Sequence, residues 1–554
     1  MRGRQGIARE SHAGGSVNRR EFLKRSSVAV AVGVSAAAGS GCASHYRGSR
    51  GPRGAQLSMA PTSRPIGANG DIRVAVVGFH SHGKSHIRAY QKMPGVQIVA
   101  LCDVDDRVLA AAADGLAKDG VRVERYRDIR RLLEDKNVDA ISCAMTNRWH
   151  TLAGVWACQA GKDVCVEKPV SHCIWEGRRL VEAARKYGRI VQADLDNRSR
   201  PAMDEAFRFV RGGAIGKIVH VRAYDYKRRV SMGKVSGPQK IPGEIDYDLW
   251  CGPAPLLPLM RAKFHYDWHW QWTTGSGEIA NNGSHELDMV RWALGKQELP
   301  RTVLSFGGRY GYSDDGQTPN THVAVYDYDG VPVVYEARGL PRGAAETRAT
   351  SRPTTTPAME MDDVVGTLAD GRPLRVVNER RASAMGGVVI VCEHGYCVGM
   401  KVYDNDGKLI RDFDDGAGDS TDTSKMRPQE HFIRAVRSRR NEDAKTDILQ
   451  GHLSASFCHM GNVSLQCGEP VSFNSAAEMT EVRDNPHARA ALERMVAHLR
   501  ANGIDTAAAG ARMTMGVRLT MDSSSERFVG DGSERANWFI KDSYRAPFVV
   551  PEQV

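Results

Sequence analysis

The sequence predicts an α/β domain built on a doubly wound parallel sheet, followed by an α+β domain with a mostly antiparallel, open sheet. From residue 71 to about 197, apolar strand-like segments alternate with helix-like segments, which is the pattern of β/α units around a buried parallel sheet. After residue 198 the strand-like segments are longer and more polar, and Asp-Gly pairs at 329–330 and 406–407 are typical of hairpin turns. This change of pattern marks the boundary between the two domains.

The expected elements follow from these segments in order. In the first domain, strands are expected at 72–77, 96–102, 140–145, 164–167 and 190–193, and helices from about 84, then at 105–118, 150–160 and 175–186. In the second domain, we expect a strand at 218–226 and helices at 428–439, 453–466 and 488–501, before an extended tail that contains YRAPFVVPE. Cys102, Cys143 and Cys165 lie inside expected strands, so we predict them to be buried, small apolar side chains.

The net charge of +11 is concentrated near the amino terminus. Residues 1–42 contribute +5 and residues 43–70 contribute +4, which leaves +2 for residues 71–554. Because the body of the protein is nearly neutral, the charge does not support a protein that binds nucleic acid through a basic surface.

The first 42 residues are similar to a twin-arginine export signal. Arg19-Arg20 precedes an apolar run at 26–38, which is shorter than the ~20 residues of a membrane-spanning helix. The run leads into small residues and Cys42, a candidate site of lipidation and the single expected attachment to a membrane. We therefore expect an exported, periplasmic protein, with a disordered linker at 43–70 that is rich in Gly, Pro, Arg and Ser.

The loop after the first strand, GFHSHGKS at 78–85, fits two phosphate-binding motifs. It satisfies the P-loop pattern GxxxxGK[ST], and it has the first and third glycines of GxGxxG at Gly78 and Gly83, with His80 in place of the second. Asp103 ends the next strand, close to the offset at which an acidic residue binds the adenosine ribose in dinucleotide-binding folds. We therefore favour a Rossmann-type dinucleotide site over an ATPase. Asp103 favours NAD over NADP, because a carboxylate repels a 2′-phosphate.

Two groups of histidines raise the question of a metal site. His80, His82 and His86 lie in and just after the glycine loop, and His265 and His269 are four residues apart. Neither group has a carboxylate or a thiolate at a spacing typical of metal sites. The sequence therefore predicts no metal site.

The charged residues Glu167 and Lys168 follow the apolar strand at 164–166, and Pro169 ends that strand. Ligands of open α/β sheets bind at the carboxyl ends of the strands, so both residues are expected at the cofactor site. A lysine in such a crevice can hold a substrate hydroxyl or share its proton. Lys168 is therefore the first catalytic candidate, and a solvated ion pair at a strand end is the alternative.

The segment GSGEIANNGSHELDMVRWALG at 275–295 supplies a second catalytic candidate. Its glycines and Asn282 mark a turn, and His285, Asp288 and Trp292 follow at helical spacing. An imidazole in the first turn of that helix is suited to general acid–base catalysis, because its pKa is close to neutrality. Asp288 is expected on the same side of the helix, and a histidine that caps and packs is the alternative.

From about residue 71 to 468 the chain resembles the Gfo/Idh/MocA family of NAD(P)-dependent sugar oxidoreductases. The resemblance is carried by TNRWH at 146–150, GKDVCVEKPVS at 161–171 and the segment at 275–295, and the tail resembles a subgroup with export signals. It implies a Rossmann domain at 71–197, a substrate and dimerisation domain at 198–475, and a C-terminal helix and tail at 476–554.

The resemblance also implies roles for individual residues. Lys168 would lie beside the nicotinamide and bind the substrate hydroxyl, His285 would be the general acid/base, and Asn147 and His150 would contact the cofactor. The chain departs from the family at Asn281, where many members have an aspartate four residues before the histidine. Because an asparagine cannot act as a base, the proton transfer would fall on His285 and Lys168, or the reaction would differ from simple dehydrogenation.

Other residues are candidates for substrate binding. The aromatic run YDWHWQW at 266–272 supplies Trp268 and Trp270, which could stack on a sugar face or pack in the core. Arg198 and Tyr226 are expected to reach the same crevice from the second domain, together with Asp288.

These observations predict an exported oxidoreductase with NAD as its cofactor and a small carbohydrate, such as a sugar, polyol or glycoside, as its substrate. One alternative is an NAD-dependent glycoside hydrolase or lyase, in which the substrate is transiently oxidised and the cofactor is regenerated. Another is a non-catalytic sugar-binding protein on the same scaffold, which His80 and Asn281 suggest. We expect no nucleic-acid partner, and we expect a homo-oligomer that pairs through the open sheet.

Overall fold

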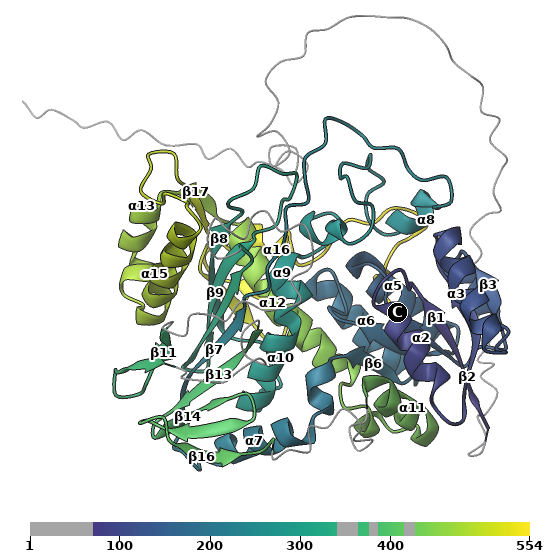
Figure 1. Ribbon diagram of the computed structural model, residues 1–554, viewed down its shortest axis with the longest axis horizontal. Coiled ribbons are helices and arrows are strands. Elements are labelled where there is room, and N and C mark those ends of the chain that lie inside the picture. Colours follow the sequence, from purple (N-terminus) through teal and green to yellow (C-terminus); the bar gives the residue numbers. More distant parts are fainter. Residues whose placement is uncertain (1–69, 341–363, 376–385, 415–426) are drawn as a thin grey trace, which may run out of the picture. The chain divides into compact units, whose positions relative to one another are not determined.

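The computed structural model describes residues 70–340, 364–375, 386–414 and 427–554 (Figure 1). The expected export signal, Cys42 and nearly all of the expected linker lie outside the described residues. None of the helices in the described ranges is long and apolar enough to cross a membrane.

The first domain is a six-stranded parallel sheet with the strand order β3-β2-β1-β4-β5-β6. Its strands are β1 (Ile72–Val77), β2 (Val96–Cys102), β3 (Glu124–Tyr126), β4 (Ala140–Cys143), β5 (Asp163–Glu167) and β6 (Val191–Asp194). The connecting helices are α2 (Gly83–Gln91), α3 (Asp106–Lys118), α4 (Ile129–Glu134), α5 (Asn147–Gln159) and α6 (Ile174–Lys186). The chain order reverses between β1 and β4, and doubly wound sheets leave a ligand crevice at such a switch point.

The predicted doubly wound parallel sheet is confirmed, and its long strands lie within two residues of their expected positions. The sequence prediction missed β3 and α4. Both are short, and the side chains of β3 are partly or fully exposed, so the segment shows no apolar run. Cys102, Cys143 and Cys165 are buried free thiols, as expected from their place in the strands.

The second domain contains a 12-stranded sheet, which η1 (Asp196–Ser199) and α7 (Pro201–Arg211) connect to the first domain. The order along its main path is β16-β15-β14-β13-β7-β10-β9-β8-β18-β17, and β19 joins β8 and β20. Among the described strands of this sheet, β7 and β10 form the single parallel pair, which confirms the mostly antiparallel prediction. Asp329 and Gly330 both have positive φ between β9 and β10, as a type I′ hairpin turn requires.

The strands of this domain are β7 (Ile218–Asp225), β8 (Thr302–Gly308), β9 (Thr321–Tyr328), β10 (Val331–Arg338), β13 (Gly386–Cys392), β14 (Gly395–Val398), β15 (Lys401–Asp404), β16 (Leu409–Asp412), β17 (Glu469–Val471), β18 (Met513–Met515), β19 (Leu519–Asp522) and β20 (Arg527–Val529), with a separate hairpin of β11 (Val364–Thr367) and β12 (Pro373–Arg375). The remaining helices are α8 (Tyr247–Cys251), η2 (Asp267–Trp270), α9 (Gly277–Asn281), α10 (Gly283–Leu294), α11 (Pro428–Ser438), η4 (Asn441–Asp443), α12 (Ile448–Gln466), α13 (Phe473–Glu478), α14 (Thr480–Arg483), α15 (Pro486–Ala501) and α16 (Ser533–Asn537).

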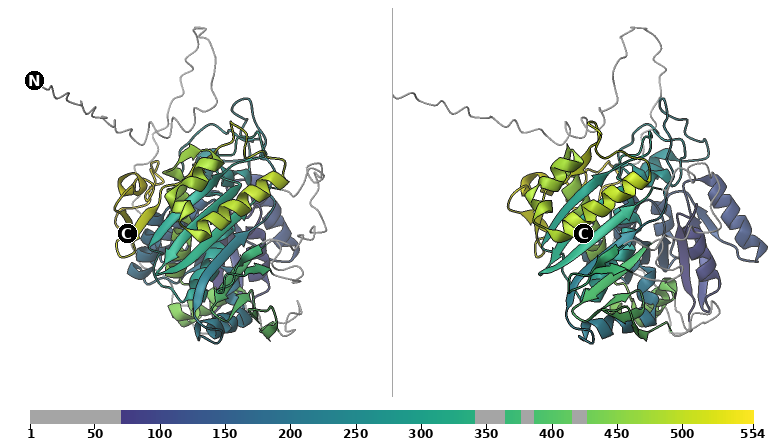
Figure 2. Two further views of the ribbon diagram at one scale, coloured as in Figure 1. Left: turned by 90° about the vertical axis from the view of Figure 1, so that its left-hand side faces the viewer. Right: turned by 60° about the vertical axis from the view of Figure 1, so that its left-hand side comes forward.

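Helices cover both faces of the second sheet around β8, β9 and β10. On one face, Phe457 of α12 packs edge-on against Tyr326 with 4.5 Å between the ring centroids. On the other face, Leu492 and Met495 of α15 share a core cluster with Val325 of β9, and Figure 2 shows α15 lying across the strands. The chain's own C-terminal helices therefore cover a part of the open sheet that we had expected to pair with a second copy.

Late segments of the chain return to the first domain. Phe432 and Val436 of α11 join the core cluster of Val74 and Tyr90. The tail then crosses α5, where Phe548 packs edge-on against Trp149 with 5.4 Å between ring centroids. Nearby, the Nη1 atom of Arg148 lies 2.5 Å from the Oδ2 atom of Asp542. These contacts fix the carboxyl ends of the first-domain strands against the second domain.

Glu336 of β10 is the centre of a buried ion cluster. Its Oε1 atom lies 2.8 Å from Nε of Arg222 on β7 and 2.5 Å from Nη2 of Arg494 on α15. Its Oε2 atom lies 2.9 Å from Nη2 of Arg338. Although burial acts in the opposite direction, the three guanidinium groups hold the pKa of Glu336 well below its usual range. The cluster therefore ties α15 to the sheet through one carboxylate.

We expect Glu336→Ala to lower the free energy of unfolding by about 3–5 kcal/mol, because it leaves buried guanidinium groups without their counter-charge. The contribution of Glu336 should be complete above the unfolded pKa of about 4.3 and should decrease as the pH falls below it, since the folded pKa is depressed. Urea unfolding at pH 7 and at acidic pH measures both effects. The exposed Asp370→Ala is the matched control, and a loss below about 1 kcal/mol at Glu336 would contradict the assignment.

Candidate functional site

A cavity of about 530 Å³ lies at the carboxyl ends of the first-domain strands, within the range of roughly 300–1,000 Å³ that ligand pockets occupy. Residues that follow β1, β2, β4, β5 and β6 form one side, and residues of α9, α10 and the segment 249–269 form the other. The predicted residues in its lining are Gly78, His80, Asp103, Asn147, His150, Glu167, Lys168, Trp268, Asn281 and His285. The fold thus brings most of the predicted site residues to one cavity at the switch point.

The glycine loop packs too closely for side chains at its two glycines. Gly78 has a φ of +75°, and a Cβ atom there would lie 2.8 Å from Cγ of Met145 on the neighbouring strand end. A Cβ atom on Gly83 would lie 2.1 Å from the carbonyl oxygen of Gly78. Gly83 therefore packs against the start of the loop and does not line the cavity. Between them, His80 stacks on His265 with 3.7 Å between ring centroids. An imidazole pair therefore forms the cavity wall where the motif usually has its second glycine.

Asp103 holds the loop through backbone hydrogen bonds. Its Oδ2 atom accepts from the Phe79 amide at 2.9 Å, and its Oδ1 atom accepts from the Asp105 amide at 3.0 Å. Burial raises the pKa of Asp103 to about 6, and the backbone hydrogen bonds oppose this shift. The carboxyl group therefore both shapes the loop and faces the cavity, where a dinucleotide ribose is expected.

Lys168 reaches across the cavity from the end of β5. Its Nζ atom donates a hydrogen bond to the carbonyl oxygen of Asn281 at 2.7 Å, so the ammonium group lies against the turn between α9 and α10. The ring nitrogens of His150 lie 2.7 Å from the Pro169 carbonyl oxygen and 3.1 Å from the Met145 carbonyl oxygen. His150 therefore connects the ends of β5 and β4 beneath the cavity.

His285 lies in the first turn of α10 and lines the cavity. Burial, and then the positive charge of Lys168, lower the pKa of its imidazole to about 3. His285 is therefore neutral at physiological pH, and in the ligand-free cavity it is a weaker base than the near-neutral imidazole expected from the sequence. The neighbouring Asn282 lines the cavity as well, and its Oδ1 atom accepts from Nζ of Lys227 at 2.6 Å.

The aromatic run divides between the cavity and the core. Tyr266, Trp268 and His269 line the cavity, and Trp268 stacks on His269 with 3.6 Å between ring centroids. Trp270 does not line it: the side chain is buried, with the guanidinium group of Arg229 5.5 Å from its ring centroid. The structure therefore places Trp268 at the cavity and Trp270 in the core, at the end of the 3₁₀ turn.

Three further predicted substrate residues do not line the cavity. Nε of Arg198 lies 2.8 Å from Oδ2 of Asp288, whose Oδ1 atom also accepts from Ser454 Oγ at 2.8 Å. Tyr226 packs under the guanidinium group of Arg338, and its hydroxyl is hydrogen-bonded to Arg222. In the structure these polar groups are paired with one another in buried clusters outside the cavity lining.

Sequence reasoning also missed several cavity residues. Asp194 is the last residue of β6 and Asp196 lies two residues beyond it, and their position at a strand end was a usable signal. His82 was considered as part of a metal site and set aside, and Tyr266 and His269 lie in the aromatic run from which the tryptophans were chosen. No pattern pointed to Arg127 or Leu249, which tertiary packing brings to the cavity.

Two family models match the chain over both domains. Residues 72–195 match the GFO_IDH_MocA model, described as the oxidoreductase family with an NAD-binding Rossmann fold. Residues 210–339 match the GFO_IDH_MocA_C2 model, described as the C-terminal alpha/beta domain of the oxidoreductase family. The first match decides between the two motifs of the loop at 78–85 in favour of the dinucleotide site.

Curated relatives are similar to parts of the chain. Levoglucosan dehydrogenase of Pseudarthrobacter phenanthrenivorans is 25% identical over 42% of this chain and 54% of its own length. Inositol 2-dehydrogenase of Salmonella typhimurium is 30% identical over 28% of this chain and 46% of its own length. A glycosyl hydrolase family 109 protein of Solibacter usitatus is 30% identical over 33% of this chain and 44% of its own length. The chain spans about half the length of these relatives.

The matched regions coincide with the two domains that form the cavity. The parallel sheet, the glycine loop and Asp103 belong to the first region, while His285 and the cavity wall around it belong to the second. By its Rossmann domain and its C-terminal alpha/beta domain, this chain belongs to the Gfo/Idh/MocA family of oxidoreductases.

Proposed function

We propose that this protein is an exported, NAD-dependent oxidoreductase that oxidises a hydroxyl group of a sugar, polyol or glycoside. The observation that carries the proposal is that the glycine loop, Asp103, Lys168 and His285 all line one cavity. Relatives named as levoglucosan and inositol dehydrogenases support the class of substrate.

The residues present fit a dinucleotide. Gly78, with a φ of +75° and no room for a Cβ atom beside Met145, allows the tight turn that leads to the start of α2, where backbone amides would bind phosphates. Asp103 would hold the adenosine ribose, and its carboxyl group disfavours the 2′-phosphate of NADP. When bound, NAD would supply the acceptor for the hydride of the carbinol carbon.

Lys168 would bind the substrate hydroxyl group, and His285 would take part in its deprotonation. The Lys168 ammonium can exchange its hydrogen bond to the Asn281 carbonyl oxygen for one to the substrate oxygen. Neutral His285 can accept the hydroxyl proton. Asn281 lines the cavity but cannot take that proton, so its amide would orient the substrate. Trp268, stacked on His269, offers an aromatic surface to an apolar sugar face.

Mass spectrometry of the cofactor released from purified protein, followed by a screen of sugars and polyols for NADH formation, tests the proposal. We expect NAD as the released cofactor and substrate-dependent NADH. Sugar binding without retention of NAD would instead support the non-catalytic sugar-binding alternative.

A redox-assisted glycoside hydrolase or lyase is the second candidate, favoured by the similarity to a glycosyl hydrolase family 109 protein. In that reaction the cofactor ends in its starting oxidation state. Release of nitrophenol from nitrophenyl glycosides without net NADH would support this candidate. Net NADH in proportion to oxidised sugar would exclude it for that substrate.

The proposed export rests on the segment 1–42. We expect Arg19→Lys/Arg20→Lys to retain the protein in the cytoplasm, because the twin-arginine pair is the recognition signal. Cell fractionation measures the effect, with Arg2→Lys/Arg4→Lys as the matched control, and unchanged export of the first variant would contradict the signal. Cys42→Ser tests lipidation through detergent partitioning.

We further propose a homo-oligomer, which light scattering would measure, with its interface away from the face that α15 covers.

A further inference from the structure

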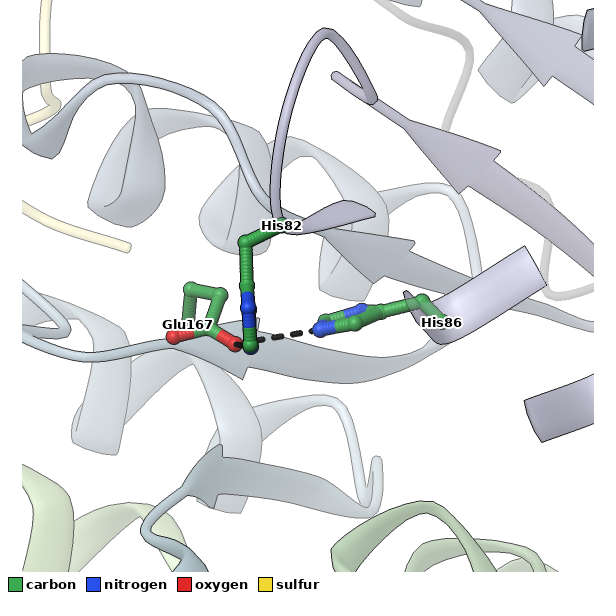
Figure 3. A group of neighbouring side chains, drawn as sticks. All are labelled: His82, His86 and Glu167. Atoms are coloured by element: carbon green, nitrogen blue, oxygen red, sulfur yellow. Dashed lines mark hydrogen bonds and ion pairs between the residues drawn. The ribbon is translucent and has the colours of Figure 1, made fainter. Parts of the chain in front are cut away.

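Two histidines and two carboxyl groups converge at the inner edge of the cavity. The Nε2 atoms of His82 and His86 each lie 3.0 Å from the Oε1 atom of Glu167, and Figure 3 shows both rings pointing toward that carboxylate. The Oδ2 atom of Asp194 lies 3.3 Å from Nε2 of His86. The sequence offered no carboxylate near the histidines, but the fold brings one from β5 and one from β6.

The backbone places these groups without distortion. His82 and His86 are four residues apart around the start of α2, so their side chains lie on the same face of the helix. Glu167 and Asp194 are register partners at the carboxyl ends of the adjacent strands β5 and β6. Each ligand group therefore belongs to a regular element or to its immediate end, which keeps the group in position.

The separations suit a metal ion. Ligand atoms at about 2.0–2.1 Å from a tetrahedral zinc ion are about 3.3 Å from one another. The observed separations of 3.0 and 3.3 Å are close to this value, and the ligand atoms of His82, His86 and Glu167 all lie within 4.8 Å of one another. An ion would need small side-chain movements and no rearrangement of the backbone.

A second layer of hydrogen bonds orients the ligands. Nδ1 of His86 lies 2.8 Å from Ser142 Oγ, and the Tyr90 hydroxyl donates to the same oxygen at 3.3 Å. Ser142 Oγ can therefore accept from Nδ1–H, which leaves the lone pair of Nε2 directed at the cluster. Gln429 Nε2 donates to Asp194 Oδ2 at 2.5 Å. Such outer contacts to histidine and carboxylate ligands are typical of protein metal sites.

Charge also favours an ion at this place. Glu167 and Asp194 are both buried, and both lie next to the same nitrogen of His86. Without an ion, the imidazoles of His82 and His86 serve Glu167, and the Gln429 amide serves Asp194. A divalent cation would balance both carboxylates together, because each could bind it directly.

The cluster is accessible from the cavity. The His82 side chain is 61% exposed, and His82, Glu167 and Asp194 all line the cavity wall. His82, His86 and Glu167 alone would leave one position of a tetrahedral ion open to the cavity, and Asp194 would fill that position as the fourth ligand.

We propose that His82, His86 and Glu167, with Asp194 as a further oxygen ligand, bind a divalent ion of the zinc class next to Lys168. Imidazole and carboxylate donors suit Zn²⁺ among the common divalent ions. The site does not depend on the proposed reaction, since its ligands are defined without substrate or NAD. An ion here would face the part of the cavity where Lys168 is expected to hold a substrate oxygen.

Zinc binding by tag-free, chelator-treated protein tests the proposal. We expect one Zn²⁺ per chain by elemental analysis after desalting, and competition with a chromophoric chelator should give at least a 100-fold weaker affinity for His82→Ala and His86→Gln. His80→Ala, in the same loop but stacked on His265, is the matched control and should retain the wild-type affinity. Co²⁺ in the wild-type protein should give the visible absorption of a four-coordinate site, and His82→Ala should lose it.

Wild-type protein that binds no zinc, or His82→Ala that binds zinc as tightly as wild type, overturns the proposal. His86 is buried and its replacement could disturb folding, but the exposed His82 avoids this difficulty, and circular dichroism checks each variant. NAD binding is measured on the same samples by fluorescence. Loss of NAD binding with zinc binding intact would count against the proposed oxidoreductase and leave the metal site standing.

Discussion

Lys168→Ala should reduce kcat/KM by about 10³-fold or more while NAD still binds. The ammonium group is the cation that the fold holds at the end of β5, against the carbonyl oxygen of Asn281. Its removal would take away the hydrogen-bond donor that stabilises negative charge on the substrate oxygen, and the loss of such a donor costs about 10²–10³-fold. Loss of its share in proton transfer would add to this effect. NAD binding should survive, because the glycine loop and Asp103 are anchored independently of Lys168.

Substrate-dependent NADH formation and NAD titration by fluorescence measure the two parts of this prediction. Lys84→Ala is the matched control, since Lys84 is an exposed lysine at the other end of the cavity loop and would be essential only in a P-loop enzyme. Unchanged turnover in Lys168→Ala would remove Lys168 from the proposed mechanism. An equal loss in Lys84→Ala would show that the effect comes from general loss of positive charge.

The fold was predictable where burial imposes a pattern. Strands β1, β2, β4 and β5 are covered on both faces, so they appear in the sequence as mainly apolar runs. The edge strand β3 has exposed side chains and no such run. The covering of β9 by α15 was not predictable, because it depends on which apolar helix meets which face. Periodicity shows that a face is apolar and does not identify its partner.

The residues of the site were predictable where they directly follow a strand of the parallel sheet. Gly78, Asp103 and Lys168 each follow a strand, and the geometry of a parallel sheet brings such positions together. Arg198 and Asp288 pair with each other away from the cavity lining, which the sequence could not show because their positions are distant along the chain. The carboxylates that meet His82 and His86 were missed for a similar reason. They come from β5 and β6, and register places them beside a helix that is distant in sequence.

His285→Ala should lower kcat/KM by about 10²–10⁴-fold, the range for removal of a general base. In the proposed reaction the neutral imidazole on α10 would accept the proton, and Asn281, which also lines the cavity, could not replace it. Because burial and Lys168 lower the pKa of His285 to about 3, the imidazole stays neutral down to acidic pH. The pH profile of the wild-type kcat/KM should therefore show no acidic limb that His285→Gln removes, and a limb near pH 6 that both proteins share would belong to Asp103.

The lowered pKa of His285 also predicts how the stability of the protein depends on pH. The unfolded chain binds a proton at His285 near pH 6.5 and the folded chain near pH 3, so this residue should lower stability progressively as the pH falls between these values. His285→Gln removes that penalty while keeping a polar side chain, and its unfolding free energy should fall less with acidification than that of the wild type. The exposed His394→Ala is the control and should follow the wild type in activity and stability. An acidic limb near pH 6.5 that disappears in His285→Gln would show a titrating, solvated histidine and would contradict a buried neutral base.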